Sequence, residues 1–246
     1  MQDKLELSGI VLSSTAVGDY DKRLVLLTKE RGKITAFARG ARKPASPYLG
    51  ASEPFNFGTF SLLEGYDAYR LAGAQIREYF SDVKQDIEGI CYATYFCDVL
   101  EYLCVEGMGD VNILNLLYLT LKALARRKTA NRLIRRIFEL KVLELDGEGM
   151  EVFSCAQCRE KAVSVFYLPK NGLLCRDCAA KLQGGYPLSE SAVYTLQYIL
   201  SSPLEKLYAF QVTDVVLTEL ERVMDCYFAE HVPKKFNSLQ ILASLS

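Results

Sequence analysis

The chain has 246 residues, of which half are hydrophobic and 24% are charged, and its net charge is −1. This composition supports a hydrophobic core, and the length allows one large domain or two to three small ones. The N-terminal residues lack the basic start and apolar run of a signal peptide, and no apolar run approaches the ~18 residues of a membrane span. We therefore expect a cytoplasmic protein with no membrane partner.

Residues 1–80 show the pattern of short β-strands separated by turns. Apolar and β-branched residues gather in short runs, and Gly, Pro and Asp residues fall between the runs. Five short strands within this segment indicate a small closed barrel, and five strands with Greek-key wrapping make an OB-fold. The expected strands are Leu7–Val17, Arg23–Thr28, Gly32–Arg39, Phe55–Glu64 and Tyr69–Arg77.

From Ser81 the apolar residues recur with the period of amphipathic helices. Helix-capping residues and glycines mark the expected ends. We expect helices over Asp82–Val105 and Val111–Arg127, one opened by Thr129 and closed by Gly147, one capped by Ser189 that runs to Leu200, and one over Val212–Glu230, before a short apolar tail, Phe236–Leu245.

Four cysteines lie between these helices in a C-x₂-C-x₁₆-C-x₂-C array: Cys155, Cys158, Cys175 and Cys178. The spacing is typical of a zinc site with four cysteine ligands. Four thiolates fill the tetrahedral shell of one Zn²⁺ and leave no position for water or substrate, which indicates a structural ion. The alternative is a pair of disulfides, which belong to oxidising compartments, or a dithiol redox centre; the sequence shows no sign of export.

Together these segments predict an α+β protein of several domains. Residues 1–80 would form an OB-fold nucleic-acid-binding domain, 81–150 the first part of an all-α helical domain, 151–185 an inserted four-cysteine zinc module, and 186–246 the C-terminal part of the helical domain.

Recognisable catalytic motifs are absent from the sequence. It contains no P-loop, no dinucleotide-binding fingerprint and no nucleophile elbow. The single histidine, His231, lies at the end of a predicted helix, where a histidine is more often a helix-end residue than a general base. We predict a binding protein with no small-molecule substrate, not an enzyme.

Basic residues concentrate in two stretches of this nearly neutral chain. Between Lys22 and Lys43 there are eight basic residues and one acidic residue, Glu30. In the predicted strand there, Phe37 shares a face with Lys33 and Arg39. Basic residues beside an aromatic side chain are how OB-folds hold single strands of nucleic acid.

The second stretch, Lys122–Arg136, holds seven basic residues and no acidic one. On its predicted helix, Leu133, Ile137 and Leu140 would face inward. Arg132, Arg135 and Arg136 would then face outward, as a second candidate surface for phosphates. A solvated surface with no ligand is the alternative for either stretch.

Three segments resemble the N-terminal barrel of the bacterial RecO family. They are Gly9–Leu12, Gly18–Lys33 and Ala38–Pro44, and Arg39-Gly40-Ala41-Arg42 followed by proline is their most specific part. The helical middle, the four-cysteine insertion and the ending Asn237–Leu239 also fit, so the resemblance covers nearly the whole chain.

The resemblance implies a recombination mediator of the RecF pathway of DNA repair, associated with the nucleoid. Such a protein binds single- and double-stranded DNA, anneals complementary strands and, with RecR, helps load RecA onto strands covered by single-strand-binding protein. The barrel residues that match the basic motif, and so carry the implied DNA contacts, are Lys22, Arg23, Lys33, Arg39, Arg42 and Lys43. The family also captures the C-terminal tail of single-strand-binding protein on its helical domain, for which the second basic stretch is a candidate.

Two other functions remain open from the residues alone. One is an interaction scaffold that binds only proteins through its zinc module and basic surfaces. The other is a zinc-ribbon transcription factor that reads duplex DNA, although the sequence shows no helix-turn-helix or recognition-helix pattern.

Overall fold

The computed structural model describes residues 4–245, which form two compact units. Unit 1 comprises Met1–Ala125 with Phe236–Ser246, and unit 2 comprises Arg126–Lys235. The boundaries cut across the four segments expected from the sequence, because the helices of residues 81–150 are divided between the units and the C-terminal residues return to unit 1. Within the described residues, no helix is both long enough and apolar enough to cross a membrane.

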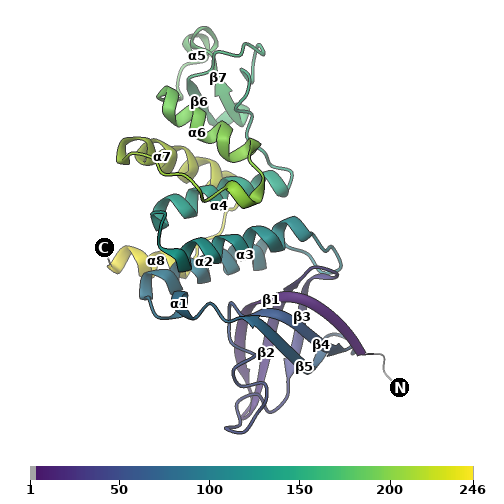
Figure 1. Cartoon of the computed structure of the whole chain (residues 1–246). Helices are drawn as coiled ribbons and strands as arrows, with labels where there is room; N and C mark the ends of the chain where they lie inside the picture. Colours follow the sequence, from purple (N-terminus) through teal and green to yellow (C-terminus); the bar gives the residue numbers. More distant parts are fainter. Residues whose placement is uncertain (1–3, 246) are drawn as a thin grey trace. The chain divides into compact units, whose positions relative to one another are not determined.

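Unit 1 begins with a closed five-stranded barrel (Figure 1). Its strands follow one another around the barrel in the order β1-β2-β3-β5-β4, in which the β3–β5 pair is parallel and the other pairs are antiparallel. Buried and partly buried residues alternate along β3, as the sequence pattern predicts for a strand with one face in the core. The five expected strands are thus confirmed: β1 (Lys4–Val17), β2 (Asp21–Thr28), β3 (Gly32–Ala38), β4 (Phe57–Leu63) and β5 (Tyr69–Glu78).

The rest of unit 1 is helical: α1 (Ser81–Lys84), α2 (Ile87–Leu103), α3 (Val111–Arg126) and α8 (Asn237–Leu245). The single helix expected over Asp82–Val105 is in fact two helices. Asp86 has an extended backbone, and its carboxylate accepts a hydrogen bond from the Gly89 amide, so it caps α2 instead of continuing α1. Helix α8 packs on α2, where Phe236 meets the buried Tyr95 edge to face with ring centroids 5.2 Å apart.

Unit 2 is built on α4 (Asn131–Leu145), which packs against both α6 (Glu190–Ser201) and α7 (Asp214–His231). Between α4 and α6 the chain forms a three-stranded sheet of order β7-β6-β8 and the short helix α5 (Figure 1). These elements span β6 (Val165–Tyr167), β7 (Gly172–Leu174), α5 (Arg176–Leu182) and β8 (Tyr186–Pro187). Ser189 caps α6 as predicted, because its hydroxyl accepts a hydrogen bond from the Ala192 amide.

Candidate functional site

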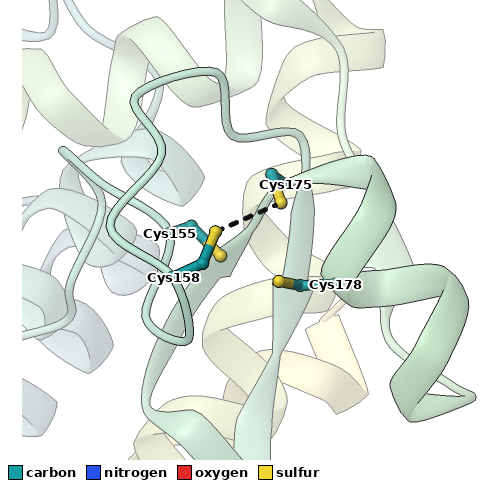
Figure 2. A group of neighbouring side chains, drawn as sticks. All are labelled: Cys155, Cys158, Cys175 and Cys178. Atoms are coloured by element: carbon teal, nitrogen blue, oxygen red, sulfur yellow. Dashed lines mark hydrogen bonds between the residues drawn. The ribbon is translucent and has the colours of Figure 1, made fainter.

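The sheet and helix α5 of unit 2 bring the four predicted cysteines together. Cys155 and Cys158 lie in the loop before β6, Cys175 caps α5 directly after β7, and Cys178 lies within α5. Their sulfur atoms all lie within 4.8 Å of one another, and the Cys158 and Cys175 sulfurs are 3.7 Å apart (Figure 2). All four are free thiols.

The sulfur spacing fits a tetrahedral shell around one ion. With metal–sulfur bonds of about 2.3 Å, as for Zn²⁺, four tetrahedral sulfurs lie about 3.8 Å apart. The observed 3.7 Å between Cys158 and Cys175 agrees with that separation. This cluster could therefore hold a metal ion, and it uses all four cysteines of the predicted array.

The thiols of the cluster differ in acidity without an ion. Burial raises the pKa of Cys155, but hydrogen bonds from the backbone amides of Cys175, Cys158 and Gln157 outweigh it and bring that pKa down to about 6. Hydrogen bonds with the sulfurs of Cys158 and Cys175 raise the pKa of Cys178 to about 12. Because neighbouring sulfurs raise the pKa of Cys178, a cation is needed before all four sulfurs act as thiolates.

On the barrel, strand register places an aromatic side chain between two arginines. Arg23 of β2 lies opposite Phe37 of β3, and Phe37 lies opposite Arg70 of β5. Cross-strand partners project from the same side of a sheet. Arg23 and Arg70 are exposed and Phe37 is half-buried, so this row faces outward.

Arg39 lies two residues beyond Phe37, and the two side chains line a pocket of about 360 Å³ together with Arg70. Sequence reasoning missed Arg70. Its strand was predicted, but the parallel pairing of β3 with β5 that brings it beside Phe37 has no local signal in the sequence.

The glycine of the Arg39-Gly40-Ala41-Arg42 motif has a conformational role. Gly40 has a φ of +65°, which favours glycine, and its amide donates a hydrogen bond of 2.7 Å to the Asp21 carboxylate. Arg42 then donates to the backbone oxygens of Gly18 and Asp19, at 3.1 and 3.2 Å. The motif thus fixes the turn between β1 and β2 and leaves Arg39 exposed beside the pocket.

Three other predicted lysines of the barrel have partners within unit 1. Lys22 forms an ion pair with Glu53 at 2.6 Å and is only 14% exposed. Lys33 donates a hydrogen bond of 2.6 Å to the backbone oxygen of Glu101, at the end of α2. Lys43 is exposed, and its ammonium lies 5.3 Å from the ring centroid of Tyr20. Lys22 and Lys33 therefore contribute to packing, whereas Lys43 remains accessible.

The arginines of α4 differ from the sequence-based prediction. Arg136 was expected to face outward, which is wrong: its side chain is 5% exposed and pairs with Glu139 at 2.9 Å and Asp225 at 2.6 Å. Arg135 pairs with Glu139 at 2.7 Å. Arg132 is exposed but forms two hydrogen bonds to the carboxylate of Glu221 on α7. Carboxylates thus neutralise this face of the helix.

Comparison with known proteins covers nearly the whole chain. Residues 1–80 match the family model "Recombination protein O N terminal", and residues 84–240 match "Recombination protein O C terminal". The chain is 30% identical to the DNA repair protein RecO of Acetivibrio thermocellus, over 98% of this chain and 97% of that protein. It is 31% identical to the DNA repair protein RecO of Desulforudis audaxviator, over 98% of this chain and 96% of that protein.

Proposed function

Because the chain belongs to the RecO family of DNA repair proteins, we propose that it is a recombination mediator that binds single- and double-stranded DNA. In this role it anneals complementary strands and, with RecR, helps load RecA onto strands covered by single-strand-binding protein. It acts by binding, without catalysing a covalent step, in the bacterial cytoplasm at the nucleoid. The observation that carries the DNA-binding part is the outward row of Arg23, Phe37 and Arg70 beside Arg39.

The barrel supports this proposal by its topology. We assign it to the OB-fold class because five strands close in the order β1-β2-β3-β5-β4. OB-folds bind single strands by pairing a positive groove, which follows the phosphates, with aromatic side chains on which bases stack. Arg23, Arg39 and Arg70 supply the charge here, and Phe37 supplies the stacking surface.

We place the DNA surface on the barrel alone. Arg132, Arg135 and Arg136 of α4 are each paired with a carboxylate, so a phosphate would have to compete with a partner already in place. Those pairings also leave α4 without the free positive charge that an acidic protein tail would require. We therefore place the surface for the tail of single-strand-binding protein outside α4.

For the four-cysteine cluster we propose one structural Zn²⁺. Cys155, Cys158, Cys175 and Cys178 would hold it, and the ion would link the loop before β6 to helix α5. Because four thiolates complete a tetrahedral shell, the ion supplies cross-linking and no Lewis-acid chemistry.

The test is binding of unrelated single-stranded oligonucleotides across a salt series. We expect affinity that is indifferent to sequence and falls with salt at a slope of about −0.7 per phosphate contact. Arg39→Glu should weaken binding strongly. Arg77→Glu is the matched control, because Arg77 is exposed on β5 and donates to the Thr59 hydroxyl, outside the Phe37 pocket. No binding, or an affinity that does not change with salt concentration, would instead support a scaffold that binds only proteins.

A further inference from the structure

The pocket beside Phe37 has a lining that differs from a plain phosphate-binding groove. Two guanidinium groups, Arg39 and Arg70, line it together with two carboxylates, Asp21 and Glu64. The remaining lining includes the half-buried Phe37 and the buried Tyr69. Its volume of about 360 Å³ lies at the small end of ligand pockets, which run from roughly 300 to 1,000 Å³.

We propose that this pocket takes one unpaired nucleobase of a DNA strand, a proposal that rests on the DNA-binding function above. The base stacks on Phe37, and the guanidinium groups of Arg39 and Arg70 contact the phosphates on either side of it. This restricts the stacking on Phe37 to a single unpaired base, flanked by phosphate contacts from Arg39 and Arg70.

The charge of the lining favours a base over a phosphate in the interior. Two arginines and two carboxylates give the lining no net charge, and the carboxylates repel a phosphate that enters between them. A nucleobase is neutral, flat and apolar on its faces, so an aromatic wall suits it. The Asp21 carboxylate is also held in place by the Gly40 amide, so the polar rim is formed before DNA arrives.

The size of the pocket has a consequence for strand annealing. A pocket for one base withholds that base from pairing and leaves its neighbours on the strand free to meet a complementary strand. In duplex DNA the bases are stacked and paired, and extruding one costs a few kcal/mol. Stacking on Phe37 therefore contributes to binding of single strands and not to binding of duplexes.

The experiment compares the full chain with Phe37→Leu, which keeps apolar bulk but removes the aromatic face. Affinity is measured for a single strand, for a duplex, and for an abasic strand of the same length and charge. We expect Phe37→Leu to weaken single-strand binding about 30-fold, the middle of the range for loss of one stacked base. Its binding to the duplex and to the abasic strand should equal that of the unmodified chain.

A second pair of variants tests Arg70. Arg70→Ala should reduce the salt slope for single strands by about 0.7, the loss of one phosphate contact. Arg77→Ala removes the same charge from the same strand outside the pocket, and it should leave the slope unchanged. Equal salt slopes for the two variants would show that Arg70 makes no phosphate contact in this pocket.

The outcomes separate this proposal from the function on which it rests. If the unmodified chain binds single strands with steep salt dependence, but binds the abasic strand equally well, the base pocket is refuted and the DNA-binding function stands. The same holds if Phe37→Leu weakens duplex and abasic binding as much as single-strand binding. If the chain binds none of the three nucleic acids, both proposals fall.

Discussion

Arg136 and Glu139 form a buried ion pair on α4, and Asp225 of α7 completes it. Glu139 is fully buried and also accepts a hydrogen bond from Arg135. A buried charge is tolerated only where partners replace the water it has lost. These side chains therefore bind α4 to α7 and give unit 2 a charged contact within its core.

Replacement of Arg136 should consequently affect stability and not DNA binding. Arg136→Met leaves the Glu139 carboxylate with one partner fewer in the core, and we expect the free energy of unfolding to fall by about 3 kcal/mol. Chemical denaturation measures this change. Arg132→Met is the control. Arg132 is exposed in its ion pair with Glu221, so loss of this pair should lower the free energy of unfolding by less than about 1 kcal/mol. If Arg136→Met kept its stability but lost affinity for single strands, Arg136 would have to contact DNA.

The same two residues show where sequence reasoning reaches its limit. Glu139 follows Arg135 and Arg136 at helical spacing, so a pairing signal was present in the sequence. The second partner of Arg136, Asp225, lies 89 residues away and had no such signal. Arg70 was missed because its neighbour Phe37 comes from a parallel strand brought together by barrel closure.

At the scale of elements, an ion pair between Lys122 and Glu78 joins the end of β5 to helix α3 within unit 1. The ammonium of Lys122 also lies over the rings of Phe80 and Tyr118, at 5.6 and 5.8 Å from their centroids. The hydrogen bond from Lys122 lowers the pKa of Glu78, although partial burial opposes this. Lys122 therefore contributes to packing within unit 1, although it is the first residue of the second basic stretch, which was a candidate surface for phosphates.

This pair should give unit 1 a pH-dependent contribution to stability. The folded pKa of Glu78 lies below its ordinary value of 4.5, so the contribution is complete above pH 4.5 and is lost as pH falls through the folded pKa. Urea unfolding of the unmodified chain and Glu78→Gln from pH 7 to pH 3 measures it. The unmodified chain should be the more stable near neutrality, and the difference should shrink as pH falls below 4.5. A difference that stayed constant from pH 7 to pH 3 would contradict the pairing.

The five strands and most helices were predictable because each has a strong local signal. The alternation of core-facing and outward-facing residues predicts β3, and the capping residue Ser189 predicts the start of α6. The break at Asp86 was not predicted, because the apolar period of α1 continues into α2 and only the cap separates them. The four-cysteine cluster was fully predictable, because the spacing of the cysteines along the sequence is typical of four ligands to one ion.

For the whole molecule, the proposed metal and DNA sites belong to different compact units. The cysteines lie in unit 2, and the Phe37 pocket lies in unit 1. Each site should therefore respond to a perturbation of its own unit.

Metal removal should act on unit 2. We expect a chelator to increase hydrogen exchange over residues 151–188, because structural metal sites contribute folding free energy to their own module. Exchange within β1–β5 should stay low, and single-strand affinity should stay within about twofold. Cys158→Ser should reproduce the chelated pattern without chelator. Loss of protection in the barrel would show that the ion stabilises both units.

Helix α8 packs on α2 although the two helices lie far apart in the sequence, so translation of one precedes that of the other. The barrel and α2 leave the ribosome long before Phe236, yet α2 needs α8 to cover Tyr95. Until residues 236–245 are translated, Tyr95 therefore lacks its contact with Phe236, and α2 lacks the packing of α8. Translation of these residues completes the apolar packing of α2.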